Sequence, residues 1–331
     1  MTPARRRVVA VIVAALGGVA LFAYAVQRAG PAEIVDSVQR IGWGLLPILG
    51  LAGVRFFLRA AAWRRCMPPG ARLSMGRAFS AFLSGDAVGN ITPLGMAASE
   101  PTKAILVRHR LETSASIASL AIDNLVYAAS IAVVMMAGLI VVLSTVPLPI
   151  EGRDAAIAAL IVLVVGGAVT LLLLRGTWST ESAPRPRWRE ALSRIRQSIV
   201  TYWTASPARV VQAFLLDMAF HVLAIYEIFL TLGWLLGGQP TIAQALVFGA
   251  LDRAVTVAFK FVPFRVGIDE ALTGAFAPVM AVQPVAGVTL AVVRKLRNLA
   301  WTGVGLLLIA GAPARTGQAS DPRGSEPARR T

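Results

Sequence analysis

The chain has 331 residues, of which 56% are hydrophobic and 15% are charged, and its mean hydropathy is +0.68. A soluble domain carries about 25% charged residues, so this composition excludes an ordinary soluble domain and indicates a polytopic membrane protein. The apolar runs are too long and unbroken for the strands of a membrane barrel. The predicted fold class is therefore an all-α polytopic membrane protein.

Charge and metal-binding residue types narrow the possible partners. The formal net charge is +15, which in a soluble protein would indicate nucleic acid. Here the basic residues cluster beside apolar runs, which is the pattern of cytoplasmic loops, so no nucleic-acid partner is expected. The single cysteine, Cys66, excludes an internal disulfide framework and a thiolate zinc site, and two histidines are too few for a histidine-rich metal site. We expect no metal and no cofactor.

Six membrane spans are predicted from the long apolar runs, in chain order: 8–26, 41–63, about 115–143, 155–174, 210–236 and about 285–312. The first run follows three arginines, and Ala23, Tyr24 and Ala25 also fit the cleavage site of a signal peptide. An uncleaved anchor is the preferred interpretation, because the run is long for a signal peptide.

The loop charges orient these spans. Basic segments are expected in the cytoplasm, namely the N-terminus, 64–77, 103–110, 175–209 and the C-terminal tail. Segments without net positive charge are expected outside, namely 27–40, 144–154 and 237–240. Both termini are therefore predicted to be cytoplasmic. The polar, basic tail, residues 315–331, is predicted to be disordered, and residues 1–314 to form one transmembrane domain.

Two segments are predicted to enter the membrane and return. Residues 78–102 lie between two loops that are both expected in the cytoplasm, so they cannot simply cross. They are predicted to form a re-entrant hairpin that turns near 90–93. By the same reasoning, 241–283 forms a second hairpin that enters from outside and turns at Pro263. A rival arrangement has eight helices that all span.

The two hairpins carry related motifs. "NITPLGMAASE", 90–100, and "KFVPFRVGIDE", 260–270, align without gaps, so that Glu100 corresponds to Glu270. The same offset aligns position Asn124 with position Arg294. Because one motif is reached from the cytoplasm and the other from outside, we predict an inverted-topology repeat of about 41–145 and 210–312. In transporters, such repeats place broken helices and the substrate site near the bilayer midplane.

Charged residues at such breaks are expensive in a membrane and are candidate binding residues. The candidates are Asn90, Pro93, Glu100, Lys260, Pro263, Gly267, Asp269, Glu270, Arg294 and Arg297. Arg294 and Arg297 share a helix face and are candidates for phosphate binding. The rival interpretation is an internal ion pair between Arg294 and Glu270 or Asp269. The two glutamates have a structural alternative, which is to hold N–H groups of the hairpins.

Two further pairs have their members four residues apart on a helix. Arg55 and Arg59 suit phosphate binding, although arginines near a cytoplasmic end more often snorkel to the interface. Asp217 and His221 suit a proton relay, although an interhelical hydrogen bond is the commoner arrangement. Both alternatives remain open from the sequence.

The two motifs resemble those of the flippase-like transmembrane domain of lysylphosphatidylglycerol synthases and its stand-alone relatives. The matching residues are Asn90, Pro93 and Glu100, then Pro263, Gly267 and Glu270, and the resemblance covers about residues 5 to 312. It implies two further site residues: Lys103, near which the family usually has an arginine, and Asp123, which begins a pair that is often aspartate-arginine. Ser99 stands where the family usually has glycine.

The resemblance implies a protein that moves lipids across the bacterial cytoplasmic membrane. Its expected partners are membrane lipids with an anionic or phosphate-bearing headgroup, such as aminoacylated phosphatidylglycerol or polyprenyl-linked sugars. The synthase domain of the relatives is not expected after the last span, so we predict no enzymatic activity and no catalytic residue. The alternative is a membrane-embedded subunit, or a scaffold, of a lipid-linked glycosyl-transfer or other cell-envelope enzyme.

Overall fold

The computed structural model describes residues 27, 31–71, 73–92, 95–175, 197, 200–260 and 262–311. Over these residues the chain is helical and forms no strand, which confirms the predicted all-α class. The predicted span 8–26, the residue Pro93, the arginine-rich segment 176–196 and the predicted disordered tail 315–331 lie outside the described residues.

The elements are α2 (Pro31–Ile41), η1 (Gly42–Gly44), α3 (Leu45–Cys66), α4 (Met75–Ile91), α5 (Gly95–Val107), α6 (Thr113–Thr145), α7 (Ile150–Arg175), α9 (Pro207–Leu236), α10 (Ile242–Ala258), η2 (Pro263–Arg265), α11 (Ile268–Phe276), η3 (Ala277–Met280) and α12 (Pro284–Ala310). Of the described helices, four are long and apolar enough to cross a membrane: Gly42–Cys66, Thr113–Thr145, Ile150–Thr170 and Pro207–Leu236. These four match four of the six predicted spans.

The predicted last span forms a helix of 27 residues, α12, but it differs from the other four in composition. Arg294, Lys295 and Arg297 lie in its middle, and α12 is not among the described helices that are apolar enough to cross. At 1.5 Å per residue it is about 40 Å long, which is sufficient for a bilayer. The count of six spans thus stays a prediction.

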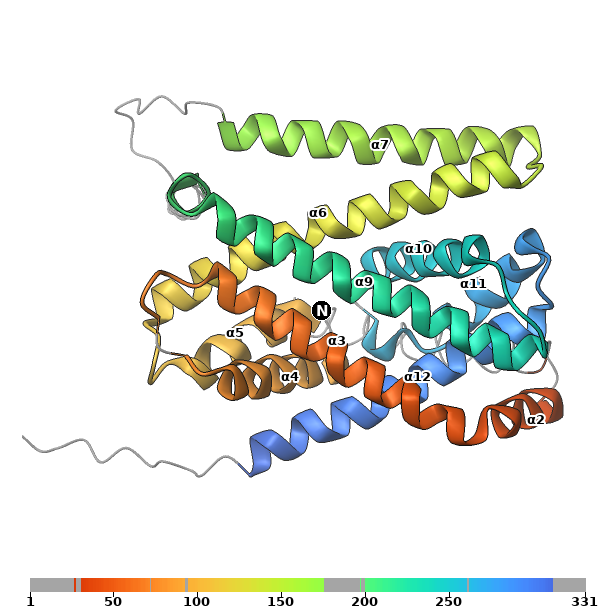
Figure 1. Ribbon diagram of the computed structural model, residues 1–331, viewed down its shortest axis with the longest axis horizontal. Helices are drawn as coiled ribbons and strands as arrows, with labels where there is room; N and C mark the ends of the chain where they lie inside the picture. Colours follow the sequence, from red (N-terminus) through yellow and green to blue (C-terminus); the bar gives the residue numbers. More distant parts are fainter. Residues whose placement is uncertain are drawn as a thin grey trace, which may run out of the picture.

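Each of the two segments predicted as hairpins forms a pair of helices with a break between them. α4 and α5 form one pair, and α10 and α11 form the other, at opposite ends of the long axis of the molecule (Figure 1). The second break contains η2, in which Phe264 and Arg265 have φ values of 50° and 48°. Left-handed backbone at residues other than glycine costs about 1–3 kcal/mol, so the surrounding packing must hold this turn.

Each half of the chain packs its hairpin against a long helix of the other half. α4 packs against α12, and α10 packs against α6, so each hairpin rests on the long helix that follows the other hairpin. Glycines permit both approaches: a Cβ at Gly305 would lie 2.6 Å from the Leu83 carbonyl oxygen, and a Cβ at Gly138 would overlap that of Ala250. α3 and α9, which precede the hairpins, pack against each other. Such an exchange is compatible with an inverted repeat, and the equivalence of the two halves stays a prediction.

The largest apolar core lies where α9, α10 and α12 meet, around Ile228, Leu232, Phe248, Leu290 and Val293. α7 lies at the periphery and packs on α6 (Figure 1). Its span has no residue buried within the structure, as expected for a helix surrounded by lipid. The charged residues are gathered instead between the two hairpins, on the inner faces of the long helices.

Candidate anion-binding cavity

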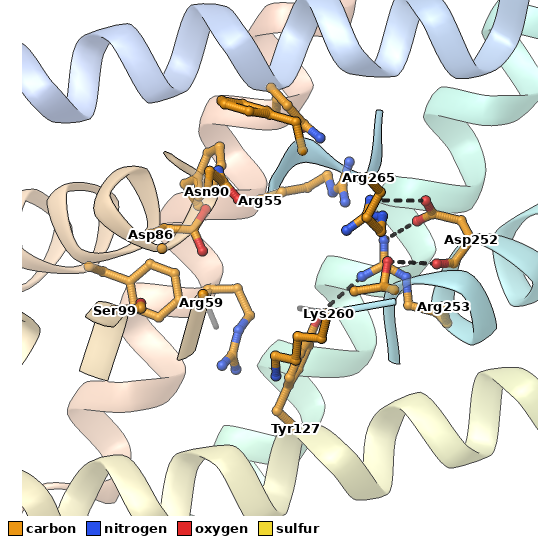
Figure 2. A pocket seen from close by; sticks show the side chains of 18 of the residues that line it. Arg55, Arg59, Asp86, Asn90, Ser99, Tyr127, Asp252, Arg253, Lys260 and Arg265 are labelled. Atoms are coloured by element: carbon orange, nitrogen blue, oxygen red, sulfur yellow. Dashed lines mark hydrogen bonds and ion pairs between the residues drawn. The ribbon is translucent and has the colours of Figure 1, made fainter. Parts of the chain in front are cut away.

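A cavity of about 250 Å³ lies between the two hairpins (Figure 2). The hairpin turns approach each other there, since a Cβ added at Gly95 would lie 3.6 Å from the carbonyl oxygen of Lys260. Eight basic and four acidic side chains of the described residues line it: Arg55, Arg59, Lys103, Arg253, Lys260, Arg265, Arg294 and Arg297, and Asp86, Glu100, Asp252 and Asp269. The wall therefore carries more positive than negative charge. Ionisable groups enclosed by apolar, membrane-type helices are by default a functional-site hypothesis.

Asp252 of α10 holds the largest group of cations. It forms ion pairs with Arg253, with Arg294 of α12 at 3.2 Å, and with Arg265 of the second turn at 4.0 Å (Figure 2). Arg253 also donates a 3.0 Å hydrogen bond from Nη1 to the hydroxyl of Tyr127 on α6. One carboxylate thus gathers three guanidinium groups from three elements at one side of the cavity.

A second group of charges joins α3, α9 and α12. Arg55 Nη1 donates to Glu227 Oε2 at 2.6 Å, and Arg297 donates to the other oxygen of the same carboxylate. Glu227 is 1% exposed and lies outside the cavity wall, whereas both arginines line the cavity. One carboxylate thus pairs with both arginines from outside the cavity wall.

Arg59 is held in a similar way. It donates from Nη2 to Asp123 Oδ2 at 2.8 Å and pairs with Asp217, and it lies over the ring of Tyr127, 3.9 Å from the ring centroid. Asp123, a predicted binding residue, lies outside the cavity wall behind Arg59, and the adjacent Asn124 lines the cavity instead. Arg59 is therefore an internal partner as well as part of the wall.

Asp217 and His221, the pair considered as a proton relay, have separate partners. Asp217 pairs with Arg59, whereas His221 Nε2 lies 3.0 Å from the hydroxyl of Ser130, and its ring stacks on Tyr127. Each side chain thus makes an interhelical contact of its own. This arrangement agrees with the structural alternative given for this pair.

The first hairpin contributes residues that have fewer charged partners. Lys103 Nζ donates to Glu100 Oε1 at 3.0 Å and lies 4.1 Å from the centroid of the Phe82 ring, while Glu100 Oε2 has no hydrogen-bond partner among the described residues. Asn90 lines the cavity and donates to Thr302 Oγ1 at 3.1 Å. Asp86 faces the cavity, and we find no ion pair or hydrogen bond to it within the described part of the chain.

The second hairpin places its motif residues differently. Glu270 is 0% exposed, accepts a 2.9 Å hydrogen bond from the N–H of Gly267, pairs with Lys295, and does not line the cavity. Gly267 has a φ of 81°, which a glycine adopts without strain, and it caps α11. Pro263 begins η2.

Arg294 does not make the ion pair that we weighed against phosphate binding. Asp269 lines the cavity and pairs with Arg265 at 2.9 Å, and Glu270 pairs with Lys295. Arg294 instead reaches Asp252 and donates to Thr273 Oγ1 at 3.3 Å. The structure thus brings Asn90, Glu100, Lys103, Lys260, Asp269, Arg294 and Arg297 to one cavity, and places Asp123, Gly267 and Glu270 outside its wall.

The residues of the cavity that the sequence reasoning missed include Asp86, Asp252, Arg253 and Tyr127. Asp252 and Arg253 lie inside an apolar helical run, so the argument that drew attention to Arg294 applies to them as well. Tyr127 carries no comparable signal, because a tyrosine in a membrane helix is common. Among the described residues, no group of three or more His, Cys, Asp or Glu side chains could hold a metal ion.

Comparison with known proteins adds the family. A family model described as the lysylphosphatidylglycerol synthase TM region matches residues 7–305. No curated protein and no solved structure matches the chain significantly. The matched range contains both hairpins and the helices around the cavity, and the apolar helices agree with a multi-pass membrane location. The chain belongs to the family of the lysylphosphatidylglycerol synthase TM region, as its two hairpin motifs had indicated.

Proposed function

We propose that this protein is a lipid translocase of the bacterial cytoplasmic membrane and that its cavity binds the phosphate of a lipid headgroup. The observation that carries the proposal is the excess of basic over acidic side chains on the cavity wall. Arginine suits this ligand, because its planar guanidinium donates two parallel hydrogen bonds to phosphate oxygens.

The arrangement of the counter-ions supports an anionic ligand. Glu227 and Asp217 lie behind the arginines of α3, outside the cavity wall. One buried donor, Arg55 Nε, has no hydrogen-bond acceptor among the described residues. An unsatisfied buried donor costs about 1–3 kcal/mol, more when it is charged, and a phosphate oxygen in the cavity would remove that cost.

The position of the cavity supports movement between leaflets. The two hairpins lie at opposite ends of the molecule, and their turns meet at the cavity (Figure 1). A headgroup bound between them would have left one leaflet without yet reaching the other, while its acyl chains remain in the bilayer. The expected orientation has both termini in the cytoplasm, so that the first hairpin opens toward the cytoplasmic leaflet.

Transfer of a fluorescent phosphatidylglycerol between the leaflets of reconstituted vesicles tests the function. Arg294→Gln should slow transfer about ten-fold or more, because it removes a charge-assisted contact of roughly 1.5–3 kcal/mol. Arg64→Gln is the matched control, since it removes the same charge from an exposed position outside the cavity. Equal transfer by wild type and Arg294→Gln would contradict the proposal. Headgroup binding without any transfer by the wild type would favour the alternative of an envelope-enzyme subunit.

A further inference from the structure

A second cavity lies on the face of the first hairpin that is turned away from the central cavity. Its volume is about 450 Å³, and α4, α5 and the end of α12 contribute to it, together with the segments that flank the hairpin. Its described lining consists of Leu73, Gly76, Arg77, Ser80, Ala81, Ser84, Leu106, Val107, His109, Arg110 and Leu308. We call this cavity the outer groove.

The outer groove has a basic rim and an apolar wall. Arg77, His109 and Arg110 are exposed, and no acidic side chain of the described residues lines the groove. Leu106 and Leu308 are each 37% exposed, so their apolar surface is open along the side of the molecule. A soluble ligand would find little polar surface there. A lipid, by contrast, could place its headgroup on the basic rim and its acyl chain on the apolar wall.

The groove is separate from the central cavity although both use the same helices. α4 presents Ser80 and Ser84 to the groove, and it presents Phe82 and Asp86 to the central cavity. The groove lies at the end of the molecule where α3 ends and α6 begins, which is the end with the basic loops 64–77 and 103–110 (Figure 1).

We propose that the outer groove binds one anionic phospholipid from the leaflet on that side. Its phosphate lies between Arg77 and Arg110, and an acyl chain runs along Leu106 and Leu308. Charge complementarity selects an anionic headgroup, because basic residues near a membrane surface attract anionic lipids. The bound lipid would hold α4 and α5 against α12 while the other face of the hairpin serves the central cavity.

Photo-cross-linking of the full-length protein in nanodiscs tests this site. The probe is phosphatidylglycerol with a photoactivatable acyl chain, and mass spectrometry maps the labelled peptides. We expect labelling at Leu106 and Leu308, and a loss on the order of ten-fold in Arg77→Gln/Arg110→Gln. The control is Arg64→Gln/Arg108→Gln, which removes the same charge at exposed positions outside the groove. Equal loss in both double variants would overturn the proposal in favour of general surface attraction.

A second variant blocks the groove without removing charge. A Cβ at Gly76 meets nothing within 4 Å, so Gly76→Leu should fill the groove and abolish labelling while the protein stays folded. Gly50→Leu is its control, because Gly50 has the same free space and does not line the groove. Full labelling of Gly76→Leu, or equal labelling by a photoactivatable phosphatidylcholine, would refute the site. Arg294→Gln should leave groove labelling intact, so this outcome is independent of the function proposed for the central cavity.

Discussion

The two motif glutamates occupy corresponding positions in the two hairpins, yet the structure gives them different surroundings. The Glu100 side chain is 22% exposed, faces the cavity, and has one oxygen without a hydrogen-bond partner among the described residues. Glu270 is fully buried, and its two oxygens are taken by Gly267 and Lys295. Glutamates that align in the two motifs therefore need not have the same role. Glu100 is available to a ligand, whereas Glu270 stabilises the second turn.

The difference extends to the neighbouring charges. In the second hairpin, Asp252 and Asp269 each pair with arginines, and these pairs join α10, the turn and α12. In the first hairpin, Glu100 pairs only with Lys103 of its own helix, and Asp86 has no such pair among the described residues. We interpret the second hairpin as the fixed basic wall of the cavity and the first as the side whose charges can change partners.

The largest effect is expected for Glu270→Gln. Removing the charge leaves Lys295 without its buried carboxylate, and breaking a buried ion pair costs about 3–5 kcal/mol. The melting temperature of the purified protein should fall strongly, as measured by fluorescence-detected size-exclusion chromatography after heating. Glu100→Gln, the same change at the corresponding position, is the control and should melt close to wild type. Equal melting temperatures for the two variants would remove the structural distinction between the hairpins.

Arg294→Gln should have the next largest effect, and it should act on lipid binding more than on stability. Arg294 shares Asp252 with Arg253 and Arg265, so that carboxylate keeps two cations when Arg294 is changed. We expect the amount of phosphatidylglycerol retained through purification to fall about ten-fold, a loss of about 1.4 kcal/mol. Quantitative lipid mass spectrometry measures it. A large loss of melting temperature with unchanged lipid content would assign Arg294 to the scaffold.

Tyr127→Phe tests whether α6 belongs to the fixed wall of the cavity. The change removes the hydrogen bond from Arg253 but keeps the ring on which Arg59 lies. The expected destabilisation is about 1–3 kcal/mol, because the change leaves the buried Arg253 donor without its acceptor, and it is measured as a decrease in melting temperature. Tyr226→Phe is a suitable control, because Tyr226 is 48% exposed on α9. A decrease as large as that of Glu270→Gln would mean that α6 belongs to the fixed wall.

Glu100→Gln should have the smallest effect on stability, because the Glu100 side chain is 22% exposed and water can replace its carboxylate beside the buried Lys103. Its effect should be on transport: the rate of phosphatidylglycerol transfer between leaflets should change while the melting temperature does not. The leaflet-transfer assay measures this. Wild-type transfer by Glu100→Gln would show that the free carboxylate oxygen has no part in the cycle.

Much of the helical pattern could be predicted from the sequence, because it depends on local features. Long apolar runs gave four helices close to their predicted bounds. The end of α4 at Ile91 and the interruption between the end of α10 at Ala258 and the start of α11 at Ile268 were also predictable, because proline, glycine and charged residues interrupt apolar runs there. The family resemblance rested on the same short motifs and is confirmed by the match over residues 7–305.

The pairing of charges was not predictable in the same way. Arg55 and Glu227 are 172 positions apart, and only the packing of α3 on α9 brings them together. Lys295 and Glu270, which form a buried pair, are 25 positions apart. Such partners depend on the rotation and depth of each helix, which apolar periodicity leaves undetermined for helices that are hydrophobic on all sides.

The central claim, that the cavity between the hairpins holds a lipid phosphate, is tested most directly by electron cryomicroscopy of the protein in nanodiscs containing phosphatidylglycerol. The account predicts headgroup density in the cavity, with phosphate oxygens within about 3 Å of the guanidinium groups of Arg55 and Arg294. Arg294→Gln, imaged in the same way, should lose that density. A cavity without headgroup density in the wild type, with ordered lipid confined to the outer surface, would contradict the account.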